Sequence, residues 1–278
     1  MPGGTWPNPI EAQSPPPGIF RALDRAPDPA PAVTTLELCL WSGPRNVSTA
    51  LMYSFAQRAD TRVLDEPLYA HYLRVSGADH PGRAEVLRAQ ESDGAKVVRD
   101  VVLSRCDRPV QFQKHMAHHL VELDRSFLRQ TVNVLLVRDP AEVVLTLRHQ
   151  VARPTLRDVG IKAQAELLAE LRAAGQEPVV LDAKQVLTDP EGVLRELCRR
   201  VALPWDRAML AWPAGARSFD GVWAPHWYQN VHQSTGFDAW KPKSESMPAE
   251  LVPLVAECRP FYAQLLGHAI RARSETGR

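Results

Sequence analysis

Residues 35–49 read TLELCLWSGPRNVST, and this stretch decides the fold. Its first seven residues are rich in apolar side chains and predict a buried strand, which the Gly/Pro signal at residues 42–44 ends. Leu51 and Phe55 lie four residues apart and predict one face of a helix, with Ser48 as its cap. The chain therefore begins its ordered part as strand, tight loop and helix.

Such a strand–loop–helix unit is a site for an anion. The helix N-terminus offers free N–H groups and the positive end of its dipole, and Arg45 adds a full charge. The alternative is an ordinary connection with Arg45 in solvent. A kinase-type P-loop needs G-x-x-x-x-G-K-[ST], whereas Gly43 is followed by Ser48 five residues later without a lysine. A dinucleotide site is disfavoured too, because no G-x-G-x-x-G follows the strand.

The rest of the chain alternates between strand and helix signals. Further strands are predicted at 61–64, 110–113, 132–137 and 179–181. Pro140 and Pro190 each open a predicted helix, the first to about His149 and the second to about Val201. This alternation predicts an α/β fold of three layers, with a parallel central sheet between flanking helices, of the P-loop nucleotide-binding type.

Proline marks a boundary near the start of the chain. Nine of the 24 prolines precede Val33, so residues 1–32 are predicted to be a proline-rich, disordered tail, and residues 33–278 a single domain. Within that domain, residues 205–240 hold five of the seven tryptophans and form a predicted irregular loop. The aromatic side chains of this loop either line a ligand pocket or form a lid on the core: Trp223, Trp227, Tyr228 and Phe237. Residues 248–273 predict a C-terminal helix that Pro260 kinks or splits.

Charge and composition exclude several classes of protein. With 33 basic and 32 acidic residues, the net charge of +1 argues against binding to a nucleic acid polymer. Apolar runs are too short to cross a membrane, and no secretory signal is recognisable. The four cysteines show no metal-binding spacing and are expected to be reduced, buried thiols in a cytoplasmic protein. The oligomeric state stays open.

The loop after the first strand resembles the 5′-phosphosulfate loop of the sulfotransferase superfamily. Those enzymes use 3′-phosphoadenosine-5′-phosphosulfate (PAPS), and their loop pattern is Pro-[Lys/Arg]-Ser-Gly-Thr-Thr. Four residues match this pattern in type: Pro44, Arg45, Ser48 and Thr49. Two depart from it, Asn46 and Val47. The resemblance implies that the 5′ side of the donor binds at Gly43, Pro44, Arg45, Asn46, Val47, Ser48 and Thr49.

Three further segments resemble the family in order and spacing, so the resemblance covers about residues 35–205. Arg138 ends a strand and Thr146 follows eight residues later, as in the family's 3′-phosphate site. Residues 180–204 resemble a module that is widespread in the family and consists of an acidic residue, a leucine, Asp-Pro, a helix and a final Leu-Pro. Glu66 lies in a Glu-Pro-Leu segment 21 residues after Arg45. In carbohydrate and protein-tyrosine sulfotransferases, a glutamate at this place acts as or near the catalytic base.

Two candidates for the catalytic base follow. Glu66 comes first, because apolar neighbours can raise the pKa of a carboxyl; the alternative for this residue is an ion pair with Arg45 or another local arginine. The second is a histidine of residues 115–119, where cytosolic members carry Lys-x-His. Met116 takes the place of that histidine, and His115 lies on the opposite side of a strand. His118 approaches the site if a helix begins after Met116.

The resemblance implies an enzyme that moves a sulfuryl group from PAPS to a hydroxyl or amine of a small acceptor. The product would be 3′-phosphoadenosine-5′-phosphate (PAP). Arg45, Glu66, Lys114 and His118 are the expected catalytic residues, where Lys114 either contacts the sulfuryl group or is solvated. No metal is expected, because a sulfuryl group demands less Mg²⁺ than a γ-phosphate. The alternatives are a catalytically silent nucleotide-binding or scaffold protein, favoured by Asn46 and Val47, and an ATP-dependent P-loop kinase.

Overall fold

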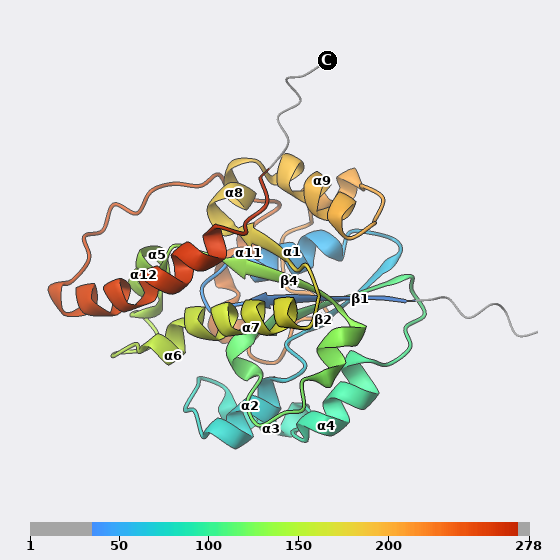
Figure 1. Cartoon of the computed structure of the whole chain (residues 1–278), viewed down its shortest axis with the longest axis horizontal. Helices are drawn as coiled ribbons and strands as arrows, with labels where there is room; N and C mark the ends of the chain where they lie inside the picture. Colours follow the sequence, from blue (N-terminus) through green and yellow to red (C-terminus); the bar gives the residue numbers. More distant parts are fainter. Residues whose placement is uncertain (1–34, 272–278) are drawn as a thin grey trace, which may run out of the picture. The chain divides into compact units, whose positions relative to one another are not determined.

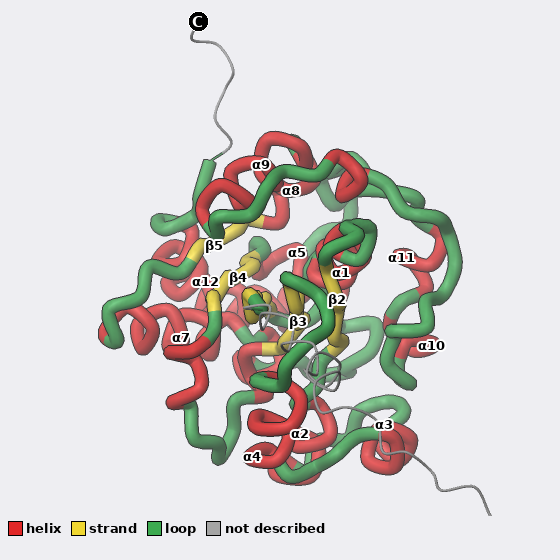
Figure 2. Tube along the Cα trace, turned by 90° about the vertical axis from the view of Figure 1, so that its right-hand side faces the viewer, coloured by secondary structure: helices red, strands yellow, loops and turns green. Residues whose placement is uncertain are grey.

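A computed structural model describes residues 35–271 of the chain, and a parallel five-stranded sheet lies at its centre (Figures 1 and 2). The strand order is β2-β3-β1-β4-β5, and every neighbouring pair is parallel. The strands are β1 (Leu36–Ser42), β2 (Thr61–Asp65), β3 (Val110–Met116), β4 (Val132–Val137) and β5 (Val179–Asp182). Each predicted strand is present, and β4 has the predicted bounds.

Helices cover both faces of the sheet (Figure 1). They are α1 (Ser48–Phe55), α2 (Tyr69–Ser76), α3 (Arg83–Ala89), α4 (Gly94–Val97), α5 (Pro140–Leu147), α6 (Leu156–Val159), α7 (Ile161–Ala173), α8 (Ala183–Thr188), α9 (Pro190–Arg200), α10 (Ala224–Trp227), α11 (Gln229–Gln233) and α12 (Val252–Leu266). A π-helical turn spans Val98–Val102, and short 3₁₀ turns span Ala117–His119, Ser126–Gln130, Arg207–Leu210 and Ala249–Leu251.

Strand β1 shows why the fold has three layers. Side chains alternate between the two faces of a strand. Leu38 and Leu40 point into a core that contains residues of α1, α2 and α9, whereas Cys39 and Trp41 point into a second core with residues of α5, α7 and α12. Both faces of β1 are therefore buried, as expected for a central strand of a parallel sheet. The predicted α/β architecture is confirmed.

The starts of α1 and α5 differ in how their backbone N–H groups are satisfied. Asp139 caps α5, because its Oδ1 accepts from Ala141 N at 2.8 Å, and Pro140 is the first helical residue as predicted. The prediction of Ser48 as the cap of α1 is wrong: Val47 occupies the cap position, and the helix start has no side-chain cap. Ser48 is the first helical residue, so its hydroxyl is left for another partner.

The C-terminal helix is shorter than predicted and is not split. Helix α12 runs through Pro260 without interruption and ends at Leu266, well before residue 273. Pro260 removes one backbone donor, but Cys258 and Leu265 are fully buried in the core on either side of it, and this packing holds the helix together. The predicted tail, residues 1–32, lies outside the described residues.

The predictions about the cysteines and about membrane spans can be compared with the structure of residues 35–271. Cys39, Cys106, Cys198 and Cys258 are all free and buried, as predicted. Within residues 35–271, none of the helices combines the length and the apolar character that a membrane span requires.

Candidate functional site

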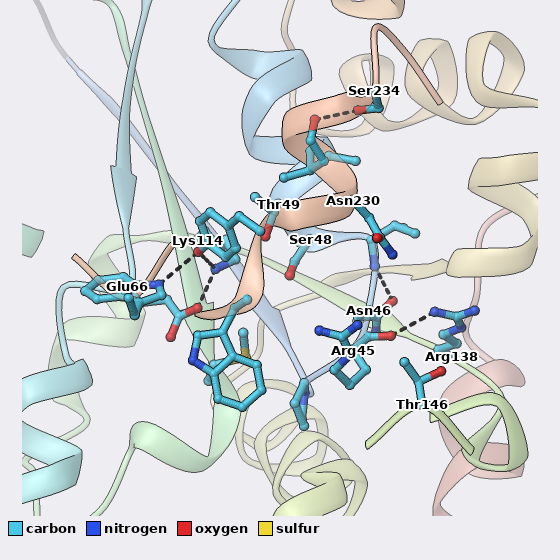
Figure 3. Close-up of a pocket in the computed structure, with 18 of the residues that line it drawn as sticks. Arg45, Asn46, Ser48, Thr49, Glu66, Lys114, Arg138, Thr146, Asn230 and Ser234 are labelled. Carbon is cyan, nitrogen blue, oxygen red and sulfur yellow. Dashed lines mark hydrogen bonds and ion pairs between the residues drawn. The ribbon is translucent and has the colours of Figure 1, made fainter. Parts of the chain in front are cut away.

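A cavity of about 330 Å³ opens beside the carboxyl ends of the central strands (Figure 3). Strand β1 lies between β3 and β4, so the loop that follows β1 opens between the ends of both neighbours. Ligands of open α/β sheets bind at such a place. The structure brings together these predicted residues as cavity lining: Pro44, Arg45, Asn46, Val47, Ser48, Thr49, Glu66, Lys114, His118, Arg138 and Thr146.

Gly43 is the predicted residue that does not line this cavity. It packs instead against the turn between α6 and α7: a Cβ at this position would lie 2.7 Å from the backbone oxygen of Val159. Such a contact is too short for any side chain. Gly43 therefore sets the path of the loop by close backbone packing, while the residues after it face the cavity.

Arg45, Arg138 and Thr146 form one end of the cavity, here termed the arginine end (Figure 3). Arg138 Nη1 donates to the backbone oxygen of Arg45 at 2.8 Å, and its Nε donates to Glu142 at 2.9 Å. Arg45 itself has a left-handed backbone, with φ of 54°. The strand end at Arg138 thus supports the loop directly and keeps both guanidinium groups close together.

The arginine end carries positive charge that the protein leaves incompletely paired. Burial, followed by the charge of Arg138, lowers the pKa of Arg45, although a guanidinium stays protonated in proteins. Arg45 Nε is buried and has no hydrogen-bond partner among residues 35–271. A bound anion would supply both the missing acceptor and the missing charge.

The N-terminus of α1 adds donors beside this charge. The first N–H groups of a helix have no partner within the helix, and α1 has no side-chain cap to satisfy them. Ser48 and Thr49 lie at this end and line the cavity (Figure 3). Hydroxyls, free N–H groups and a helix dipole together favour a phosphate or sulfate group.

Asn46 explains how the loop is held although it departs from the family pattern. Its Nδ2 donates to the backbone oxygen of Leu136 in β4 at 2.9 Å, and its Oδ1 accepts from Val47 N at 3.0 Å. The asparagine therefore ties the loop to the neighbouring strand and orients the next backbone group.

The opposite end of the cavity is lined by Glu66, Lys114 and Tyr228, with Asp65 directly behind them, and these four residues are termed the lysine end. Lys114 Nζ donates to Asp65 Oδ1 at 3.0 Å, to Tyr228 OH at 2.7 Å and to Glu66 Oε1. Lys114 is completely buried. The alternative of a solvated Lys114 is thus wrong, and so is the ion pair of Glu66 with an arginine, because Lys114 is its partner (Figure 3).

The charges at the lysine end are strongly coupled. Burial raises the pKa of Glu66; Lys114 pulls this pKa down and Asp65 pushes it up, with a net rise. For Lys114, burial lowers the pKa, but the two carboxylates outweigh it, so the pKa is raised. The charged form of Lys114 is therefore favoured, while the carboxyl of Glu66 holds a proton more readily than an ordinary glutamate.

The histidines of the β3 end separate into two environments. His115 stacks on Trp41 with ring centres 4.3 Å apart, away from the cavity, as predicted from its side of the strand. A 3₁₀ turn begins directly after Met116, which brings His118 into the cavity lining. Burial, with His80 as the next cause, lowers the pKa of His118 to about 3, so its imidazole is neutral at neutral pH.

Further residues line the cavity: the aromatic residues Trp223, Trp227, Tyr228 and Phe237, which the sequence offered as pocket lining or core lid, and three polar residues that sequence reasoning missed. Tyr228 and Trp223 come from the predicted irregular loop, and Trp223 Nε1 donates to Tyr228 OH at 3.0 Å. Both line the cavity, as do Asn230, Ser234 and Lys243. For Asn230 and Ser234 the only sequence signal was the concentration of tryptophans at 205–240, which identifies a packed segment without revealing which polar residues face a ligand; Lys243 lies beyond that segment.

Two solved structures with a similar fold are sulfotransferase domains. The domain of the Synechococcus PCC 7002 olefin synthase superposes with a TM-score of 0.56 at 18% identity, covering 81% of this chain and 94% of that domain. The domain from the curacin biosynthetic pathway superposes with a TM-score of 0.54 at 17% identity, covering 84% of this chain and 98% of that domain. At these identities the likeness supports the fold.

Curated relatives share more sequence but are longer. Branched-chain-amino-acid aminotransferase-like protein 1 of Arabidopsis thaliana is 38% identical over 235 residues, which is 84% of this chain and 42% of the relative. Branched-chain-amino-acid aminotransferase-like protein 2 of the same plant is 36% identical over 229 residues, which is 82% of this chain and 41% of the relative. The chain thus spans about two fifths of their length, and their names assign no activity to the shared part. The profile of the sulfotransferase domain matches residues 36–269, and the chain therefore belongs to the sulfotransferase domain family.

Proposed function

We propose that this chain transfers a sulfuryl group from PAPS to a hydroxyl or amine of a small acceptor and releases PAP. One observation carries the proposal: a single cavity holds an incompletely paired cationic end and a carboxylate of raised pKa at its other end. The volume of about 330 Å³ falls within the range of small-molecule sites.

The residues of the arginine end fit a nucleotide with phosphate groups at both its 3′ and 5′ sides. Arg138 and the Thr146 hydroxyl would hold the 3′-phosphate. Arg45, the hydroxyls of Ser48 and Thr49 and the free N–H groups of α1 would hold the 5′ side. Positive charge at the 5′ side also stabilises the negative charge that develops on the leaving oxygen. The donor supplies the activated sulfuryl group.

Glu66 would act as the general base. As the acceptor oxygen or nitrogen bonds to sulfur, the bond from sulfur to the bridging phosphate oxygen breaks, and Glu66 takes the acceptor proton. His118 is the weaker candidate, because an imidazole with a pKa of about 3 attracts a proton poorly at neutral pH. We assign His118 to orienting the acceptor by hydrogen bonding.

Two rival functions make different use of the same cavity. A P-loop kinase would need a lysine for the nucleotide phosphates, but Lys114 donates to two carboxylates and a tyrosine hydroxyl. A silent nucleotide-binding protein would need no base at all. The raised pKa of Glu66 favours an enzyme over such a protein. The cytoplasmic location, the small acceptor and the dispensable metal stay predictions.

Thermal unfolding with added nucleotides tests the proposal. PAP at one hundred times its Kd, in the presence of EDTA, should stabilise the chain by about 2.7 kcal/mol. The Arg45→Ala variant should lose this stabilisation, while Arg172→Ala, an exposed change on α7 that pairs with His268, should keep it. Stabilisation by Mg-ATP and not by PAP would overturn the proposal in favour of a kinase.

A further inference from the structure

Two adjacent carboxylates, Asp65 and Glu66, reach the same ammonium group. Consecutive residues of a strand point to opposite faces, so a continuing strand would separate their side chains. Asp65 lies opposite Lys114 in the parallel register of β2 and β3. Glu66 follows with a left-handed backbone, at φ of 42°, and its N–H donates to the backbone oxygen of Lys114 at 2.8 Å. This turn brings the second carboxylate back to Lys114.

The two carboxylates differ in how completely they are engaged. Asp65 accepts from Lys114, from Tyr228 OH at 2.8 Å and from the backbone N–H of Gly221 at 3.0 Å. Among the described residues, the Glu66 carboxylate has one hydrogen-bonding partner, Lys114. Glu66 and Lys114 line the cavity, whereas Asp65 is not part of its lining. Asp65 is thus held from three directions behind the site, while Glu66 faces the substrate space.

We infer that Asp65 is a positioning residue that keeps Lys114 paired while Glu66 gains and loses its proton. The inference rests on the proposed function, in which Glu66 is the base. A buried ammonium that loses its only counter-charge is strongly destabilised. Because Asp65 also accepts a hydrogen bond from Lys114, at 3.0 Å, Glu66 can become neutral without leaving the ammonium unpaired.

Tyr228 completes this arrangement. Its hydroxyl accepts from Lys114 at 2.7 Å and from Trp223 Nε1 at 3.0 Å, and donates to Asp65 at 2.8 Å. The hydroxyl therefore fixes the distance between the ammonium and Asp65. It also joins the tryptophan-rich segment to the end of β2, which places the wall of the cavity relative to the base.

The titratable groups that surround Glu66 come from several elements. They are Asp65 of β2, Lys114 of β3, Tyr69 of α2, Tyr228 after α10, His118 and His119 of the 3₁₀ turn, and His80 of the loop after α2. Burial lowers the pKa of all three histidines, so they are neutral at neutral pH. The charges that change the proton affinity of Glu66 are therefore those of Asp65 and Lys114.

The variant Asp65→Asn tests the inference through the pH profile of kcat. Removing the charge of Asp65 lets Lys114 act on Glu66 alone, so the pKa of Glu66 should fall. The acidic limb should then move to lower pH by about one unit or more, and the plateau should fall about tenfold, since a weaker base accepts the proton less well. PAP affinity should stay unchanged. A purely structural role would lower stability without moving the limb.

A second pair of residues offers matched controls. Asp182 ends β5 as Asp65 ends β2, is buried, and accepts from Tyr262 OH at 3.4 Å. Asp182→Asn and Tyr262→Phe should leave the pH profile in place. Tyr228→Phe keeps every charge, so it should lower kcat several-fold while the limb stays within about half a unit. This variant also keeps the inference testable if Asp65→Asn does not fold.

Titrating the Glu66 carboxyl by isotope-edited NMR separates this inference from the proposed function. A lower pKa in Asp65→Asn than in the parent supports the inference even if no transfer from PAPS is detected. An unchanged Glu66 pKa, with a limb that does not move, overturns it while leaving the proposed function intact.

Discussion

At one end of the cavity Arg138 pairs with a carboxylate while the neighbouring Arg45 has no ion pair among residues 35–271, and at the other end two carboxylates share a single ammonium. Arg138 Nε donates to Glu142 at 2.9 Å, and Arg45 Nε lacks a partner among residues 35–271. Lys114 is enclosed by Asp65, Glu66 and Tyr228 and donates to all three. The two ends therefore carry opposite imbalances of charge.

This difference separates binding from proton transfer. The arginine end lacks negative charge, which a nucleotide would bring with it. At the lysine end two carboxylates already pair with the one ammonium, and burial, helped by Asp65 against Lys114, raises the pKa of Glu66. A substitution at the arginine end should therefore alter the affinity for the donor, and a substitution at the lysine end should alter the rate of the chemical step.

The largest expected effect comes from Glu66→Gln. Glutamine keeps the size of the side chain and a hydrogen-bond acceptor for Lys114, but it cannot take a proton. We expect kcat to fall about a hundredfold or more, with PAP affinity within twofold of the parent by isothermal titration calorimetry. A matching loss of PAP affinity would show that the two ends are not separate.

Arg138→Ala should weaken nucleotide binding at the arginine end of the cavity. Loss of a charge-assisted contact to the 3′-phosphate should weaken PAP binding about tenfold to a hundredfold. Binding of AMP, which has no 3′-phosphate, should weaken less, because it loses only the support that Arg138 gives to the backbone oxygen of Arg45. Calorimetry with both nucleotides measures this preference, and Arg172→Ala serves as control. If the variant still prefers PAP over AMP as strongly as the parent does, Arg138 does not contact the 3′-phosphate.

A smaller effect is expected from Gly43→Ala, which tests the support of the arginine end. The new Cβ would lie 2.7 Å from the backbone oxygen of Val159, so the loop must shift. Chemical denaturation should show a loss of about 1–3 kcal/mol in the free energy of unfolding, together with weaker PAP binding. Gly267→Ala is the matched control, because its nearest contact would be an ordinary 3.4 Å. Equal stabilities would contradict the close packing of Gly43.

The smallest effect should come from His118→Gln. In the parent, kcat should rise with pH as Glu66 loses its proton, and the raised pKa of Glu66 places this rise above the ordinary range of a carboxyl. Glutamine can replace the hydrogen bonds of a neutral imidazole, so the acidic limb should stay where it is, with kcat reduced only a few-fold. A limb that disappears in this variant would make His118 the base.

The sequence predicted the fold well because its signals are local. Apolar runs bounded by Gly, Pro and charged residues predicted every strand, and β4 within its observed bounds. Ser48 shows the limit of such signals. A serine at a helix start is typical of a cap, yet Val47 takes that position and Ser48 lines the cavity. Residue preference alone does not distinguish a capping hydroxyl from one that faces a ligand.

The lysine end was harder to predict because it depends on distant parts of the chain. Asp65 and Tyr228 are 163 residues apart, and Tyr228 lies in a segment without periodicity. The pairing of Lys114 with both carboxylates needs the register of β2 against β3 and the left-handed turn at Glu66. The sequence motif identified Glu66, but the role of its neighbour Asp65 became visible only in three dimensions.

Turnover of PAPS tests the central claim most directly. The chain, radiolabelled PAPS and a panel of acceptors (a naphthol, tyramine and N-acetylglucosamine) should give a sulfated product and an equal amount of PAP, in the presence of EDTA. Glu66→Gln should give neither at a comparable rate. Tight PAP binding by the parent with no turnover of PAPS on any acceptor would contradict the account and identify a silent nucleotide-binding protein.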